Sequence, residues 1–261
     1  MARERTFRSE AIVLRRSNFG EADRLLTLYS HDFGKLRALA KGARKPQTRK
    51  TGHVELFMRT NFLFARGREI DIITQAELVE AYAGLRADLV RATYAAYVAE
   101  LLDAFTVEGE RDARKYRLLA AALAWYATGD NYLLAARHFE LRLLALAGYQ
   151  PQLFHCVRCG RSVADGEEAR FSPELGGILC PDCAPADRAA RPLSAAALKA
   201  LRQLQTRSWE SLLGLQLRRS LHTELEGLMH DYLRYLLERN LRSAEFLQRL
   251  RREAAMLAAG S

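Results

Sequence analysis

Four cysteines are the residues of this chain with the clearest chemistry. They form two C-x2-C pairs, CVRC and CPDC, with residues 160–179 between them, and the chain contains no other cysteine. Each pair can place two thiolates on one ion, and the glycines at positions 160, 176 and 177 allow the backbone to turn tightly nearby. The spacing therefore predicts a zinc ribbon with these ligands: Cys156, Cys159, Cys180 and Cys183.

The predicted zinc ion is expected to be structural. Four thiolates fill a tetrahedral shell, whereas catalytic zinc sites keep one position open for water. The segment between the pairs is too short for an apolar core of its own, and one bound zinc ion would supply stability on the order of 10 kcal/mol. His155 adjoins Cys156 and is an alternative ligand, although a partly exposed histidine is the simpler explanation.

The second chemical feature is a run of positive charge. The stretch Gly34–Lys50 carries seven Lys or Arg residues and no Asp or Glu, and the whole chain has a formal net charge of +9. A cluster of one sign builds a local positive potential, which is typical of a surface that binds a polyanion. The seven cations are Lys35, Arg37, Lys41, Arg44, Lys45, Arg49 and Lys50.

The N-terminus and the apolar runs indicate where the protein works. The chain is charged from its third residue, and no apolar signal segment follows. Its longest apolar run, Leu118–Ala127, is about half of the roughly 20 residues that a membrane span needs. We therefore expect a cytoplasmic protein without a membrane partner, whose cysteines stay reduced and bind metal.

The elements that must position these residues change in character along the chain. Short runs rich in β-branched and aromatic residues predict five strands and a small antiparallel barrel of the OB type. After Ala76 the apolar period becomes helical, with Ser194 as a helix N-cap. The predicted fold class is α+β. The predicted strands are 6–16, 23–30, 34–42, 53–65 and 69–75, and the predicted domains are a barrel (1–77), a helical domain (78–153 and 188–261) and an inserted zinc module (154–187).

Enzyme functions find little support. The chain has no Walker A or G-x-G-x-x-G motif. Glu69 and Asp71 would share one face of a strand, which is the beginning of a two-metal nuclease site, but a solvated strand face explains them as well. A zinc-ribbon nuclease and a sequence-specific nucleic-acid-binding regulator stay open as alternatives. A nuclease assay with divalent metal and a test of sequence preference would distinguish them.

Several motifs together resemble one protein family. The stretch IVLRRSNFGEADRLLTLYSHDFGKLRALAKGARKPQTR (residues 12–49) is similar to the N-terminal signature of the bacterial RecO recombination mediators. FELRLLALAGYQP (139–151), followed by CVRC, GGILC and CPDC, resembles the central signature of the same family. The resemblance implies an OB-fold, a helical domain and a zinc module, with no catalytic residues. Residues after Pro192 carry little of the signature.

The resemblance also implies partners and a function. Proteins of this family bind single- and double-stranded DNA, anneal complementary strands even when SSB coats them, and act with RecR to help RecA replace SSB at the nucleoid. The cations of the basic stretch, with Arg15 and Arg24, are then the candidate DNA-binding residues. Phe19, Tyr29 and Phe33 are candidates for base stacking, although a core position is the favoured interpretation of each. For the acidic C-terminal tail of SSB, the candidate contacts are Arg137, Phe139 and Arg142, although a packed helix face explains Phe139 as well.

Overall fold

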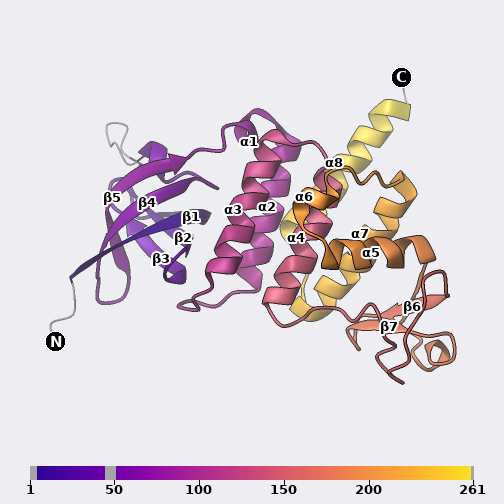
Figure 1. Cartoon of the computed structure of the whole chain (residues 1–261). Coiled ribbons are helices and arrows are strands. Elements are labelled where there is room, and N and C mark those ends of the chain that lie inside the picture. The colour runs from indigo at the N-terminus through magenta and orange to yellow at the C-terminus, as the bar shows by residue number, and fades with distance from the viewer. Residues whose placement is uncertain (1–4, 45–50, 260–261) are drawn as a thin grey trace. The chain divides into compact units, whose positions relative to one another are not determined.

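The computed structural model describes residues 5–44 and 51–259 (Figure 1). The chain forms two compact units, one made of residues 1–130 and 243–261 and the other of residues 131–242. The first unit contains a barrel followed by helices, and the second contains helices and a small sheet, so the predicted α+β class is confirmed. The finer division into a barrel, a helical domain and a zinc module stays a prediction.

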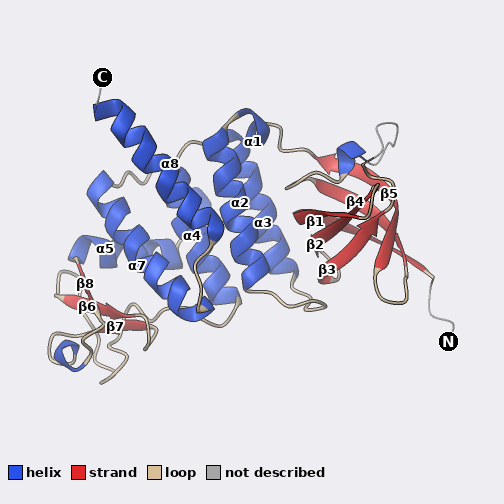
Figure 2. Ribbon diagram, turned by 180° about the vertical axis from the view of Figure 1, so that it is seen from behind, coloured by secondary structure: helices blue, strands red, loops and turns tan. Residues whose placement is uncertain are grey.

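The N-terminal barrel is closed by five strands, as predicted. Its strand order is β1-β2-β3-β5-β4, and every neighbouring pair is antiparallel except β3 and β5 (Figure 2). The parallel contact between β3 and β5 is short, pairing Ala38 with Asp71 and Leu39 with Ile72, and it closes the barrel. The strands are β1 (Thr6–Phe19), β2 (Asp23–Ser30), β3 (Gly34–Ala40), β4 (Arg59–Ala65) and β5 (Asp71–Glu80).

Alternation along the strands builds the barrel interior. Ala11 and Val13 of β1 belong to a buried cluster with residues such as Leu26 and Phe62. Ile12 and Leu14 point to the other face of β1 but are also buried, and helix α2 (Leu89–Ala104) packs against this strand. Coverage on both faces explains why β1 contains a continuous apolar run where a half-exposed strand would alternate.

The fourth strand begins later than predicted. Residues 53–58 do not extend β4. His53 ends a 3₁₀ turn, η1 (Thr51–His53), residues 54–58 follow it as an irregular segment, and Phe57 adopts a left-handed backbone with φ 67°. The N–H of Phe57 donates to the carbonyl of Val13 at 2.9 Å, and the N–H of Val13 donates to the carbonyl of Met58 at 3.1 Å. These two bonds fold the segment against the irregular part of β1, so regular pairing starts only at Arg59.

The helices agree with the predicted periodicity. Asp88 and Asp112 cap α2 and α3 by accepting backbone N–H bonds, and Ser194 caps α5 by accepting from the N–H of Ala197 at 3.1 Å. Of the described helices, none is long and apolar enough to cross a membrane. Beside α2, the first unit contains α1 (Gly84–Ala87), α3 (Ala113–Thr128) and α8 (Arg242–Ala259). The second contains α4 (Tyr132–Leu146), α5 (Ala195–Thr206), α6 (Trp209–Leu212) and α7 (Arg219–Leu237).

A three-stranded sheet in the second unit was not predicted. Its order is β7-β6-β8, with both pairs antiparallel. Strands of three or four residues are too short to show a period of two in the sequence. The strands are β6 (Ala169–Ser172), β7 (Gly177–Leu179) and β8 (Arg191–Leu193).

The loop after α2 closes against the start of β3. The N–H of Gly109 donates to the carbonyl of Lys35 at 2.9 Å, which brings the backbone of this loop beside Gly34. Gly34 has φ 66°, and a Cβ at this position would lie 1.7 Å from the carbonyl oxygen of Glu110. Only glycine therefore fits where the barrel and this loop meet.

We expect Gly34→Ala to lower the free energy of unfolding by about 3 kcal/mol or more, because it adds a backbone clash to left-handed strain. Gly20→Ala is the matched control, since Gly20 has φ 57° but no atom within 4 Å of its added Cβ. The control should lose only about 1–2 kcal/mol. Urea unfolding followed by circular dichroism measures both, and equal losses would contradict the close approach at Gly34.

Candidate metal centre and basic barrel surface

The four predicted cysteines meet in one cluster. Their Sγ atoms all lie within 4.8 Å of one another, and all four are free thiols. The Sγ atoms of Cys159 and Cys180 are 3.8 Å apart, far beyond the disulfide length of about 2.05 Å. A zinc tetrahedron with bonds of about 2.3 Å has sulfur–sulfur edges of about 3.8 Å. The donor set and its spacing therefore fit a metal ion bound by four thiolates.

Backbone turns hold each cysteine pair in place. In the first pair the N–H of Gly160 donates to the carbonyl of Cys156 at 2.9 Å, and Gly160 adopts φ 74°. In the second pair the N–H of Cys183 donates to the carbonyl of Cys180 at 3.0 Å. Val157 also bonds to the carbonyl of Ile178 at 2.9 Å, which ties the first turn to β7. The two turns face each other because the sheet joins them.

The thiols differ in their protonation. Burial tends to raise the pKa of Cys156, but hydrogen bonds from backbone N–H groups of Cys180, Cys159 and Arg158 outweigh burial and lower this pKa to about 6. Burial and the neighbouring thiols raise the pKa of Cys183 to about 12. A cluster of sulfur atoms therefore opposes removal of its last protons, and a bound cation would reverse that effect because thiolate is the metal-binding form.

An arginine that the sequence did not reveal anchors the cysteine module to α5. Arg202 is buried, its Nε donates to the carbonyl of Leu153 at 2.8 Å, and its Nη2 donates to the carbonyl of Val163 at 2.7 Å. Its other nitrogen pairs with the carboxylate of Asp165. In the sequence, Arg202 looks like one more charge on the solvated face of an amphipathic helix, so no local signal marks it.

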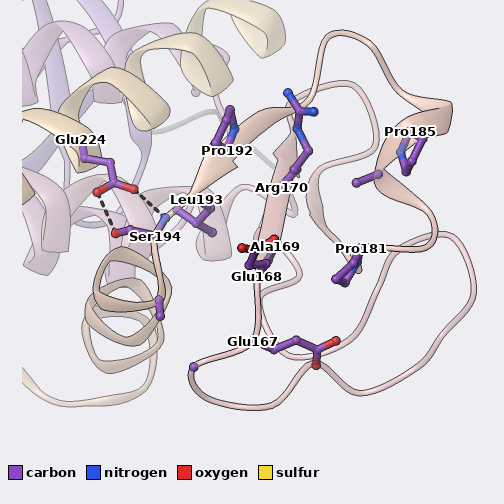
Figure 3. A pocket seen from close by; sticks show the side chains of 13 residues that line it. Glu167, Glu168, Ala169, Arg170, Pro181, Pro185, Pro192, Leu193, Ser194 and Glu224 are labelled. Carbon is purple, nitrogen blue, oxygen red and sulfur yellow. Dashed lines mark hydrogen bonds between the residues drawn. The ribbon is translucent and has the colours of Figure 1, made fainter.

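A cavity of the second unit lies beside the metal module. It has a volume of about 660 Å³ and is lined by β6, β8, the second cysteine turn and the start of α5. Figure 3 shows that Glu224 reaches the N-cap of α5, where it accepts from the N–H of Ser194 at 2.7 Å and from its hydroxyl at 2.8 Å. Three prolines line the cavity, and its carboxylates outnumber its single arginine.

The predicted basic stretch does not present all of its charge to solvent. The Nζ of Lys35 lies 2.6 Å from the carboxylate of Asp103, and it donates to the carbonyls of Asp103 at 2.8 Å and Thr106 at 3.1 Å. Lys35 therefore joins β3 to the C-terminal end of α2. Lys35 is thus a structural contact inside this unit, and its predicted role in DNA binding stays a prediction.

Three other predicted cations are also paired. The Nε of Arg37 lies 2.6 Å from Glu108, and Arg15 lies 3.1 Å from Asp103 although its side chain is 71% exposed. Arg24 is mostly covered and lies 2.6 Å from Glu55. The carboxylates come from the helical segment or from the loop before β4, so the basic sequence is partly neutralised by distant residues.

Lys41 and Arg44 remain the available cations of the predicted stretch. Both are exposed in the turn that follows β3, and the guanidinium of Arg44 donates to the carbonyl of Gly20 at 3.3 Å. The other three predicted cations, Lys45, Arg49 and Lys50, lie outside the described residues.

The three aromatic candidates for base stacking differ in how far their rings are exposed. Tyr29 is fully buried in the first unit, so its stacking role is corrected to a core role. Phe19 is 54% exposed at the end of β1. Phe33 is half-buried. Its ring makes a T-shaped contact with the ring of Phe7, and the guanidinium of Arg111 lies over its face. Phe19 and Phe33 are thus the two predicted rings that a nucleobase could reach.

The candidate contacts for an acidic tail are mostly internal. Arg137 is buried and pairs with Glu140, which is fully covered, and Phe139 is 1% exposed. Arg142 is partly exposed and donates to the carbonyl of Arg207. The expectation of an exposed site at Arg137 and Phe139 is therefore corrected, because both side chains pack inside the protein.

The structure does not place the two carboxylates of the nuclease alternative, Glu69 and Asp71, on one strand. β5 begins at Asp71, so Glu69 lies in the bend before the strand and the two residues do not alternate on it. The carboxylate of Asp71 accepts from the N–H of Gly67 at 3.3 Å, which is a role in the turn.

Comparison with known proteins matches both halves of the chain. The sequence profile described as "Recombination protein O N terminal" matches residues 1–82, and "Recombination protein O C terminal" matches residues 86–245. A protein of Roseiflexus sp. strain RS-1 named DNA repair protein RecO is 43% identical over 95% of this chain and 87% of its own length. A protein of the same name from Desulforamulus reducens is 41% identical over 94% of this chain and 94% of its own length. One from Dehalococcoides mccartyi strain 195 is 32% identical over 97% of this chain and 99% of its own length.

We expect the purified protein to carry one zinc ion per chain and Cys180→Ser to carry none, because three thiolates with an alcohol bind zinc poorly. Elemental analysis measures the metal, and thiol titration before and after chelation should show protection of the four cysteines. Ser162→Ala, an exposed change in the same module, is the control. Equal zinc contents in Cys180→Ser and the unsubstituted protein would contradict the four-thiolate site.

Proposed function

The chain belongs to the RecO family of DNA repair proteins, and from this membership together with its barrel we propose that it is a recombination mediator that anneals complementary DNA strands. It would bind single- and double-stranded DNA, including strands coated by SSB, and no catalytic group is needed. The observation that carries the proposal is the family match over nearly the whole chain, which coincides with a closed five-stranded barrel bearing exposed cations.

Annealing without catalysis has a direct physical basis. Two DNA strands repel each other through their phosphates, and a cationic surface reduces that repulsion when it binds both. Contacts to phosphates carry no sequence information and leave the base edges free to pair. The exposed Lys41 and Arg44 are suited to such contacts, whereas Lys35 and Arg24 would first have to leave their carboxylates.

The metal of this protein is proposed to be a single structural zinc ion. Cys156, Cys159, Cys180 and Cys183 would hold it and leave no open position for water. The ion would fix the two cysteine turns relative to β7, since the strands of the segment between the turns, β6 and β7, are only four and three residues long. No step of annealing passes through this ion.

The proposed partners follow from family membership. The protein would act with RecR, contact the acidic C-terminal tail of SSB and so promote the loading of RecA, at the bacterial nucleoid in the cytoplasm. Arg142 is the one residue of the predicted tail site that is not buried, so it alone is kept as a proposed contact.

The first test is the annealing rate of complementary fluorescent oligonucleotides coated with SSB, measured without nucleotide. We expect the protein to accelerate annealing, because charge neutralisation needs no hydrolysis. As the control for nuclease activity, the same reaction is run with added Mg²⁺, and the lengths of the oligonucleotides are then measured to detect cleavage. Unchanged annealing despite intact DNA binding would contradict the proposal, and cleavage or strong sequence preference would favour a nuclease or a regulator.

A second test addresses the exposed turn after β3. Reversing the charge of Lys41 and Arg44 should remove two phosphate contacts and flatten the slope of log affinity against log salt by about 1.4 for single-stranded DNA. Reversal of Lys199 and Arg239, which are exposed in the other unit, changes the net charge equally and should leave the slope unchanged. Fluorescence anisotropy at several salt concentrations measures both slopes, and identical slopes would exclude this turn from the DNA contact surface.

A further inference from the structure

A cavity on the barrel combines aromatic rings with arginines. Its volume is about 290 Å³, and its walls come from β1, the start of β3, the loop between β4 and β5, and the loop that follows α2. Phe7 and Phe33 form the aromatic part of the wall. The volume lies at the small end of the range for ligand pockets, roughly 300–1,000 Å³.

The rings form a continuous series of contacts that begins in the core. Phe64, fully buried, stacks on Phe7 with 4.7 Å between ring centroids, and Phe7 meets Phe33 edge to face at 4.8 Å. The guanidinium of Arg66 lies 4.5 Å from the ring of Phe7, and that of Arg111 lies 5.2 Å from the ring of Phe33. Phe33 is thus held from one side by packing while a planar exposed cation covers its face.

The arginines of this cavity differ from the other cations of the barrel. Arg66, Arg68 and Arg111 are all exposed, and among the described residues no carboxylate lies within 4 Å of their charged groups. Lys35 and Arg37, by contrast, are held by Asp103 and Glu108. The three free guanidiniums can therefore turn toward a ligand without breaking an ion pair.

The carboxylates of the cavity do not cancel this charge. Glu108 is paired with Arg37, and Asp71 accepts from the N–H of Gly67. Asp71 keeps its negative charge, because the N–H group is neutral, and Glu69, exposed beside Arg68 in the sequence, is the other acid of the lining without a cation partner among the described residues. Cations of the lining outnumber its carboxylates, so an anionic ligand is favoured over a cationic one.

We propose that this cavity is a base-stacking subsite for single-stranded DNA, in which one unpaired base lies on the face of Phe33 and the three arginines contact the flanking phosphates. The proposal rests on the DNA binding proposed above and deepens it. A base is planar, as is the guanidinium of Arg111 that now covers the ring, and this exposed side chain can move to a phosphate when the base takes its place.

The geometry selects a single strand over a duplex. A base within a duplex already stacks on its neighbours and cannot reach a half-buried ring at the wall of a small cavity. A single strand can turn one base out at little cost and keep its phosphates near Arg66, Arg68 and Arg111. Phe33 therefore adds affinity for single strands, while the arginines serve any DNA backbone.

Anisotropy with a fluorescein-labelled mixed-sequence 15-mer and with its duplex tests the proposal on the full-length protein. Phe33→Leu should weaken single-strand binding about 10-fold with an unchanged salt slope, and it should leave duplex binding within 2-fold. Phe33→Tyr keeps an aromatic face and should restore single-strand affinity. Joint replacement of Arg66, Arg68 and Arg111 by Gln should flatten the single-strand salt slope by about 2.

Phe246→Leu is the matched control. Phe246 is an exposed ring of α8 with the guanidinium of Arg249 over it at 5.9 Å, and its replacement should change neither affinity nor slope. Failure of the unsubstituted protein to bind the 15-mer would overturn the proposed function itself. Intact binding with no loss in Phe33→Leu, or an equal loss for single strand and duplex in a folded variant, would overturn the subsite and leave the proposed function standing.

Discussion

The contact on which the first unit depends is the one between Lys35 and the C-terminal end of α2. A single ammonium group meets the carboxylate of Asp103, the backbone carbonyl of the same residue in the last turn of α2, and the carbonyl of Thr106 just beyond the helix. The negative end of the helix dipole lies at the same place and favours a cation there. Because the side chain is mostly covered, loss of its partner would leave a poorly solvated charge, so this contact fixes the barrel against its helices.

In the second unit, too, a buried cation that binds backbone carbonyls fixes one part of the fold to another, here the metal module to α5. Arg202 joins two carbonyls on either side of the first cysteine turn to α5, and Gln205 adds a bond from its amide to the carbonyl of Pro151 at 2.8 Å. The zinc ligands alone would fix the two turns relative to each other. They would not fix the module relative to the helices, and that is the contribution of α5.

Much of this architecture was predictable because its signals are local. The five strands, the main helices, the Ser194 cap and the four-cysteine cluster each depend on residue type and on short spacing, and the structure contains all of them. The partners of the basic residues are not local. Asp103 lies 68 residues beyond Lys35, and Glu55 lies 31 residues beyond Arg24, so no spacing rule could show that these cations are neutralised. Arg202 was missed for the same reason.

A count of basic residues is therefore a poor measure of a DNA-binding surface, and the distance of each cation from a carboxylate is a better one. A paired arginine gains little from a phosphate, because the new contact replaces one that already exists. By this measure the binding potential of the first unit moves from Lys35, Arg37 and Arg24 toward cations without such partners in the described part of the chain, among them Lys41, Arg44, Arg66, Arg68 and Arg111. Three of these five, Arg66, Arg68 and Arg111, border one cavity that also presents an accessible aromatic ring, a feature that phosphate binding alone does not need. Cations beside an aromatic face are what a flexible strand with unpaired bases needs, since its phosphates and its bases must be bound at the same time.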